Sequence, residues 1–202
     1  MSAVMQPATG VARLRLKYGA DNNALLETFA SARPSAQAAA SLTRGLARLT
    51  DAALTELWVM SLMPPGAALV AAGGYGRGEL FPHSDVDVLV LLPAAPDDAL
   101  HGAASHFVTA CWDIGVEPGS SVRTLEECLA EAARDVTGQA ALLEARFVCG
   151  ARRLFNDFQR ARDAAMDARA FLRAKTLEMK QRHVKYEDTP YALEPNCKES
   201  PG

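Results

Sequence analysis

The sequence has few of the features that mark secreted, membrane or nucleic-acid-binding proteins. Cysteine is scarce, with four residues among 202, and no two of them form the Cys-x-x-Cys pair that structural zinc and redox sites use. No stretch approaches the roughly 18 uninterrupted apolar residues that a membrane helix needs, and residues 1–23 lack the apolar core of a signal peptide. The formal net charge is -3, whereas domains that bind nucleic-acid phosphates usually carry a basic excess. We therefore expect a globular, cytoplasmic protein whose partner is neither a membrane nor a nucleic acid.

The chain is predicted to contain three segments. Residues 1–34 mix glycine, asparagine and proline with short apolar clusters, so we interpret them as a lead-in with at most one short helix. Residues 35–150 are predicted to form the main domain. Residues 151–202 are predicted to be the start of a helical domain, which we interpret as truncated because the turn-rich ending closes on Pro-Gly.

Helical periodicity covers much of the chain. Apolar residues recur at spacings of three and four from Ser35 until Pro64, which predicts a long amphipathic helix, and residues 97–112 repeat this pattern. Thr124 and Glu127 match a capping box, so another helix is expected to begin there. Two further helices are predicted, over residues 137–148 and 163–186.

Short apolar runs predict the strands. Residues 67–72 and 86–92 have the length of buried strands, and glycine or proline closes each of them. A third strand is expected around residues 115–123. A small mixed sheet flanked by helices, with a helical C-terminal extension, is an α+β fold.

Two aspartates open the second predicted strand. Asp85 and Asp87 are separated by one residue, so strand alternation places both carboxylates on one face, about 7 Å apart along the backbone. Val86, Val88 and Val90 occupy the opposite face, where they can anchor the strand in the core. Closely held carboxylates repel each other unless a cation lies between them, and Mg²⁺ prefers such oxygen ligands together with substrate phosphates. The sequence therefore predicts a Mg²⁺ site at the two aspartates.

A glycine-rich segment lies directly upstream. Residues 73–78 read Gly-Gly-Tyr-Gly-Arg-Gly, and glycine lets the backbone approach a phosphate chain closely. We expect Gly73 and Gly74 to contact phosphates through the backbone, Arg77 to add a positive charge, and Ser84 to donate its hydroxyl to a phosphate oxygen. The segment is not a Walker A loop, since no Gly-Lys-Ser/Thr follows, nor a Rossmann fingerprint, since an acidic strand follows it instead of a helix. The pattern predicts a triphosphate site.

The glycine-rich segment and the Asp-x-Asp motif are specific only in combination. Alone, a glycine-rich loop is usually a turn, and Asp-x-Asp is usually a pair of solvated acids. Together, a strand, Gly-Gly and then Ser-Asp-x-Asp opening an apolar strand resemble the polymerase-beta-type nucleotidyltransferases. This resemblance implies their fold and a third carboxylate on a neighbouring strand, which completes the metal site and can accept the proton of the attacking hydroxyl. Glu117 fits the third predicted strand and is our choice for this catalytic role beside Asp85 and Asp87, and Asp113 is the alternative.

Further blocks narrow the resemblance to one family. They are Gly73–Pro82, Ser84–Asp87, Trp112-Asp113, Ser121–Glu127, Leu143–Arg146, Gln181–His183 and Tyr191–Gly202. Over about residues 65–202, the chain resembles the bifunctional uridylyltransferase and uridylyl-removing enzymes that modify PII nitrogen-signalling proteins. The resemblance implies transfer of UMP from UTP to a tyrosine of a PII protein, with Mg²⁺ at the paired aspartates and release of pyrophosphate. The chain is too short to include that family's uridylyl-removing and glutamine-sensing domains.

The nucleotidyltransferase motif does not encode the acceptor. Two alternatives to PII modification therefore stay open at this point: a nucleotidyltransferase that acts on another acceptor, and an inactive fragment with a nucleotide-binding or regulatory role.

Overall fold

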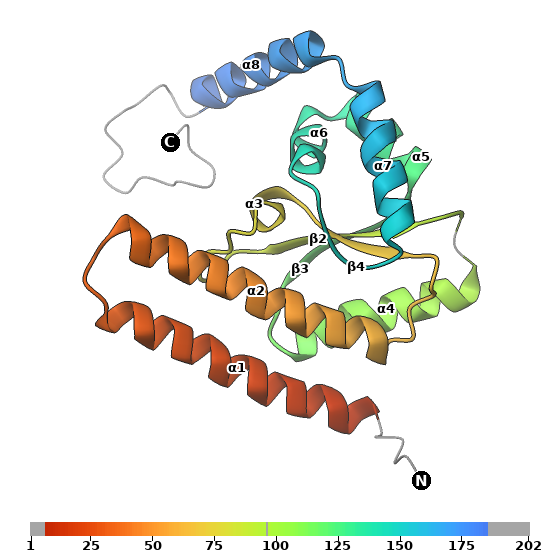
Figure 1. Cartoon of the computed structure of the whole chain (residues 1–202). Coiled ribbons are helices and arrows are strands. Elements are labelled where there is room, and N and C mark those ends of the chain that lie inside the picture. The colour runs from red at the N-terminus through yellow and green to blue at the C-terminus, as the bar shows by residue number, and fades with distance from the viewer. Residues whose placement is uncertain (1–6, 96, 186–202) are drawn as a thin grey trace.

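The computed structural model describes residues 7–95 and 97–185, which form an α+β domain (Figure 1). Its elements in chain order are α1 (Pro7–Ser31), α2 (Ala36–Met60), β1 (Ala68–Ala71), α3 (Gly73–Gly76), β2 (Val86–Leu92), α4 (Asp98–Asp113), β3 (Pro118–Thr124), α5 (Leu125–Arg134), α6 (Val136–Leu143), β4 (Arg146–Gly150), α7 (Arg152–Ala165) and α8 (Ala168–Lys185).

The four strands form one mixed sheet in the order β3-β2-β1-β4. β1 pairs antiparallel with both β2 and β4, whereas β2 and β3 run parallel. The two strands that the apolar runs predicted are confirmed, and β2 has the predicted bounds. The predicted α+β class, with a small mixed sheet flanked by helices, is confirmed as well.

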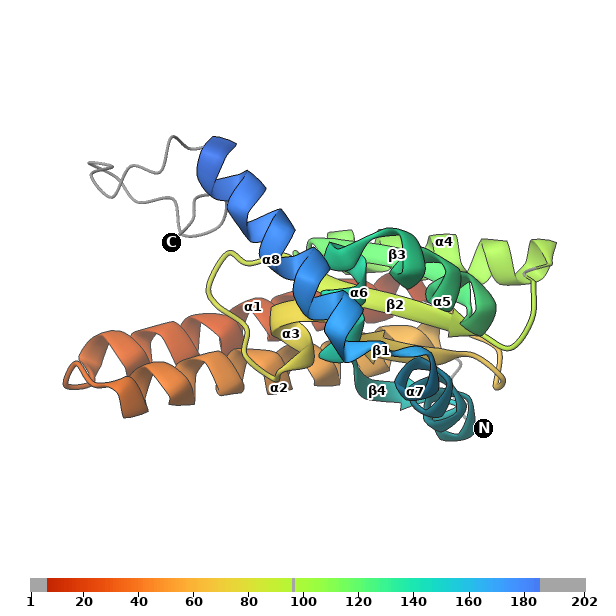
Figure 2. The same ribbon diagram turned by 90° about the horizontal axis from the view of Figure 1, so that it is seen from above.

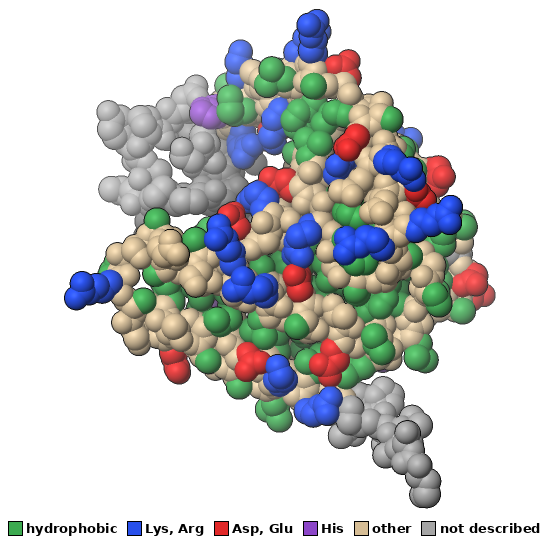
Figure 3. Space-filling view, in the orientation of Figure 1, with side chains coloured by type: hydrophobic (Ala, Val, Ile, Leu, Met, Phe, Trp, Pro, Cys, Tyr) green, Lys and Arg blue, Asp and Glu red, His purple; other side chains and the backbone are tan. Residues whose placement is uncertain are grey.

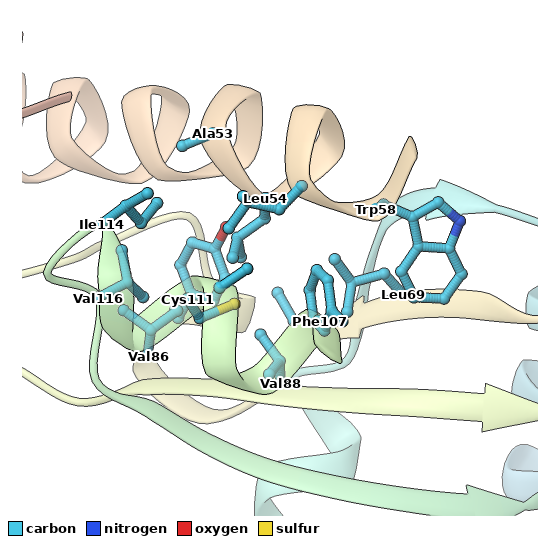
Figure 4. Packing of buried hydrophobic residues seen from close by; sticks show 14 of the residues in the cluster. Ala53, Leu54, Trp58, Leu69, Val86, Val88, Phe107, Cys111, Ile114 and Val116 are labelled. Atoms are coloured by element: carbon cyan, nitrogen blue, oxygen red, sulfur yellow. The ribbon is translucent and has the colours of Figure 1, made fainter. Parts of the chain in front are cut away.

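Helices cover both faces of the sheet (Figures 1 and 2). On one face, α2 and α4 pack against β1 and β2, and α1 lies outside α2. On the other face, apolar side chains of β1 and β2 meet α5, α6 and α7. Figure 4 shows Val86 and Val88 pointing from β2 toward α2, with Trp58 and Phe107 in edge-to-face contact nearby. This packing fixes β2, the strand that opens with the two aspartates.

The expectation of at most one short helix in residues 1–34 is wrong. Residues 7–31 form the 25-residue helix α1, which runs antiparallel to α2 (Figure 1). Leu14 is buried against the core, and the Tyr18 and Thr50 hydroxyls are hydrogen-bonded at 3.1 Å. The glycines and asparagines of this segment lower its intrinsic helix propensity, but packing against α2 outweighs that cost.

Two other predicted helices need correction. The helix expected over residues 137–148 ends at Leu143, and residues 146–150 form the edge strand β4. The single helix expected over residues 163–186 is divided, because α7 ends at Ala165 and α8 begins at Ala168. The Asp167 carboxylate accepts hydrogen bonds from the first free backbone amides of α8, which caps a new helix at this point. The capping box at Thr124 is confirmed.

Charged side chains are unevenly spread over the surface. In Figure 3, lysine and arginine side chains gather in a band over α2 and α7, although the net charge is -3. Within residues 7–95 and 97–185, none of the helices combines the length and the apolar character that crossing a bilayer requires.

Candidate functional site

The candidate site lies where β2 begins, on the sheet face that α5, α6 and α7 cover. Along β2, Val86 and Val88 are buried and Asp87 between them is exposed, so the predicted alternation is confirmed. Asp85 precedes the strand by one residue and is also exposed. β2 therefore packs its apolar face in the core, and the carboxylates of Asp85 and Asp87 are exposed at its start.

Two glycines make room for the Asp87 carboxylate. A Cβ added at Gly119 would lie 2.5 Å from Asp87 Oδ1, and one added at Gly73 would lie 2.9 Å from Oδ2. Real Cβ atoms essentially never come this close, so any larger residue at either position would displace the carboxylate. Gly73 also has a φ of +53°, which side chains rarely adopt. The carboxylate is thus held in a gap between the turn after β1 and the neighbouring strand β3.

The register of β2 and β3 bears on the choice between Glu117 and Asp113. Asp87 is paired with Gly119, and the Val86 amide donates to the Glu117 carbonyl at 3.0 Å. Asp85 and Glu117 each directly precede the first residues of their strands, Val86 and Pro118, which are paired. Asp113 instead ends α4. Glu117 is exposed, and its role as the third carboxylate stays a prediction, as does the alternative, Asp113.

The side chains of the two aspartates fit a hard cation such as Mg²⁺, because they offer exposed carboxylate oxygens and the flanking glycines leave space beside Asp87. In the part of the chain that the structure describes, no three His, Cys, Asp or Glu side chains lie close enough to hold a metal ion together. Protein ligands from two carboxylates, completed by substrate phosphates, are typical of Mg²⁺ sites.

The glycine-rich segment forms a single helical turn, α3. It begins directly after β1, and the Ala72 amide donates to the Asp87 carbonyl at 3.0 Å. Gly76 packs against the backbone of Glu144, where a Cβ would overlap the Glu144 carbonyl. The glycines thus let the turn approach both β2 and the segment that follows α6.

The two predicted polar phosphate contacts, Arg77 and Ser84, both follow this turn in the chain. Arg77 Nη1 donates to Glu144 Oε2 at 2.6 Å, and its Nε lies 3.6 Å from Glu79 Oε2. The hydrogen bond to Glu144 raises the pKa of Arg77, so its charge persists. Ser84 is exposed beside Asp85, in a turn where its amide donates to the Phe81 carbonyl at 3.1 Å. A triphosphate near Arg77 would therefore share that guanidinium with the Glu144 carboxylate.

Sequence reasoning did not find two parts of the site. Gly119 was not singled out, although a glycine inside a strand often marks a close approach of another group. Arg146 stands out in the sequence only as the last residue of the Leu143–Arg146 block, yet its guanidinium donates to the carbonyls of Tyr75 and Gly76, each at 3.2 Å. Gly119 and Arg146 both reach the site through strand pairings that bring distant residues together.

Comparisons with known proteins identify the family of the chain. Residues 56–193 match the model of the family described as nucleotidyltransferase domain. The chain is 53% identical over 190 residues to a bifunctional uridylyltransferase/uridylyl-removing enzyme of Cupriavidus metallidurans, covering 94% of this chain. It is 52% identical over 203 residues, all of this chain, to the protein of that name from Burkholderia vietnamiensis, and 57% identical over 157 residues, 78% of this chain, to the one from Bordetella avium.

The matches cover only a part of these relatives. The chain spans 22% of the length of the Cupriavidus metallidurans protein, 23% of that from Burkholderia vietnamiensis and 18% of that from Bordetella avium. Its α+β fold, with the aspartates at the start of β2 and the glycine turn after β1, is consistent with the polymerase-beta type. The chain therefore belongs to the nucleotidyltransferase domain family and is homologous to one part of the bifunctional uridylyltransferase/uridylyl-removing enzymes.

Proposed function

We propose that this chain transfers UMP from UTP to a tyrosine of a PII nitrogen-signalling protein and releases pyrophosphate. The observation that carries this proposal is the Asp87 carboxylate, held between Gly73 and Gly119 beside the glycine turn. This geometry supports nucleotidyl transfer. The identity of 52 to 57% with enzymes named uridylyltransferases supports a uridine nucleotide as the donor.

The triphosphate of UTP would lie along the α3 turn. Gly73 and Gly74 let backbone approach the phosphates, and Ser84 supplies a hydroxyl donor on the side of Asp85. Arg77 adds a guanidinium that can bind phosphate in a bidentate manner, in exchange for part of its pairing with Glu144. These groups would fix the orientation of the α-phosphorus relative to the aspartates, and such positioning is the main source of catalysis in phosphoryl transfer.

Asp85 and Asp87 would hold Mg²⁺. The bound ion supplies charge neutralisation for the phosphate oxygens and for the leaving pyrophosphate. The aspartates suit this role because strand β2 holds their backbone still from its buried face, through Val86 and Val88.

The acceptor would be the phenolic oxygen of a tyrosine. It attacks the α-phosphorus in line, a new P–O bond forms, and the bond between the α-phosphorus and the bridging oxygen to the β-phosphate breaks. Pyrophosphate leaves with that bridging oxygen and its electron pair. Glu117, which precedes β3 by one residue, would accept the phenolic proton.

Labelling of the acceptor tests the proposal directly. The 202-residue chain, a purified PII protein and Mg²⁺ are incubated with UTP labelled at the α-phosphate or at the γ-phosphate. We expect the α-label on PII, no γ-label, and no label on a PII variant whose acceptor tyrosine is phenylalanine. Transfer of the γ-label, or equal labelling of the phenylalanine variant, would contradict the proposal, and so would the absence of any label.

Gly119 offers a test of the gap around Asp87. Gly119→Ala should lower the rate of UMP transfer about 10- to 100-fold, because displacing a reacting or ligating group by about 1 Å has an effect of this size. The free energy of unfolding should change little, because Asp87 is exposed and can turn into solvent. Initial rates and urea unfolding measure the two effects.

Ser121→Ala is the matched control for Gly119→Ala. Ser121 lies on the same face of β3, two residues further along and opposite Leu89, so its substitution alters the strand without entering the gap. Its transfer rate should stay within about twofold of the wild type. A wild-type rate in Gly119→Ala would show that the position of the Asp87 carboxylate does not matter.

A further inference from the structure

Arg146 ties the glycine turn to the rest of the domain. It is the first residue of β4, and its side chain is 32% exposed. Its Nε donates to the Gly76 carbonyl and its Nη2 to the Tyr75 carbonyl, both at 3.2 Å. The same guanidinium forms a bidentate ion pair with the Asp51 carboxylate of α2, with Nη1 to Oδ2 at 2.8 Å and Nη2 to Oδ1 at 3.0 Å. One side chain therefore joins the turn, α2 and β4.

Tyr75, inside the α3 turn, contacts both Asp51 and Arg146. Tyr75 is 2% exposed, and its hydroxyl donates to Asp51 Oδ1 at 2.5 Å. The Arg146 guanidinium lies 5.3 Å from the ring centroid, within the range of a cation–π contact. Burial raises the pKa of Tyr75 above its ordinary value, so the phenol stays a neutral donor. We call Asp51, Tyr75 and Arg146 the turn-anchoring cluster.

The turn-anchoring cluster holds the C-terminal end of α3. The N-terminal end of α3 lies against the Asp87 carboxylate. Tyr75 and Gly76 are bonded to Arg146, whereas Gly73, three residues before Gly76, lies against Asp87 Oδ2. A four-residue turn is too short to bend independently at its two ends. A shift at Gly76 would therefore move Gly73 and Gly74, the residues proposed to approach the triphosphate.

We infer that Arg146 is a positioning residue for nucleotide binding, acting through Tyr75 and Gly76 on the backbone that approaches the triphosphate. The inference rests on the proposed function, because it assigns the α3 turn to the phosphates. An arginine suits this role because its planar guanidinium serves two carbonyls and one carboxylate at once from a fixed geometry. A lysine ammonium keeps the charge but cannot span these acceptors.

Binding of a UTP analogue that cannot react tests the inference without requiring turnover. The 202-residue chain is titrated with α,β-methylene UTP in the presence of Mg²⁺, and its thermal unfolding is followed in parallel. Arg146→Lys should weaken binding about tenfold at a temperature where the variant remains folded, because the turn loses its anchor. Tyr75→Phe, which removes only the hydroxyl bond to Asp51, should weaken binding by a smaller factor.

Ser61→Ala is the matched control, since it removes another part-buried hydroxyl bond, to His106, between the end of α2 and α4. It should lower the unfolding temperature without changing the affinity for the analogue. Wild-type affinity in Arg146→Lys, with only a lower unfolding temperature, would overturn the inference and leave a purely structural role. Failure of the wild-type chain itself to bind the analogue would instead contradict the proposed function.

Discussion

Replacing Asp85 and Asp87 together by asparagine should reduce UMP transfer about 1,000-fold or more, which corresponds to roughly 4 kcal/mol of lost transition-state stabilisation. Asparagine has the shape of aspartate but lacks the charge that a divalent cation requires. Both side chains are exposed, and the valines on the opposite face hold the strand. The urea midpoint should therefore stay that of the wild type, and retention of more than a tenth of the wild-type rate would refute the site.

Two single variants refine this experiment by separating the candidates for the third carboxylate. Glu117→Gln should slow transfer and flatten the dependence of the rate on pH, because a neutral amide cannot accept the phenolic proton. Asp113→Asn should behave like the wild type, since Asp113 ends α4, whereas Glu117 directly precedes β3, the neighbour of β2. The reverse order of effects would move the third carboxylate to Asp113.

Local patterns in the sequence were enough to predict the strand that carries the aspartates. The run of valines and leucines from Val86 to Leu92 signals a buried strand, and alternation alone places Asp87 on the face opposite to Val86 and Val88. The capping box at Thr124 is equally local, because it consists of two residues three positions apart. Features of this kind need no knowledge of the rest of the chain.

Features that depend on distant partners escaped prediction. β4 is a strand because residues 146–150 pair with β1, almost 80 residues upstream, and its short apolar segment alone reads equally well as the end of a helix. α1 has glycine and asparagine in its interior and is stabilised as a helix by its packing on α2. The gap around Asp87 has the same origin, since Gly119 reaches it only through the parallel pairing of β2 and β3.

Gly76→Ala should lower the free energy of unfolding by about 3 kcal/mol or more, comparable with severe overpacking in a core. A Cβ at this position would lie 3.0 Å from the Glu144 carbonyl carbon, closer still to its oxygen, and 3.2 Å from the Ala71 carbonyl oxygen. These are backbone atoms, so no side-chain rotation can relieve the clash. Urea unfolding measures the loss, and the affinity for the UTP analogue should fall with it because the turn must move away from Glu144.

Gly102→Ala is the matched control for this substitution. Gly102 lies inside α4, and a Cβ there meets nothing within 4 Å, so alanine should raise the stability by about 0.5 to 1 kcal/mol through helix propensity alone. If Gly76→Ala lowers the free energy of unfolding and Gly102→Ala raises it, the loss of stability at Gly76 comes from the contact with Glu144 and not from the loss of a glycine. If Gly76→Ala were as stable as the wild type, the close packing of the turn on the residues after α6 would be wrong. The inference that Arg146 positions the backbone near the triphosphate would then be wrong as well, since Arg146 acts through the same turn.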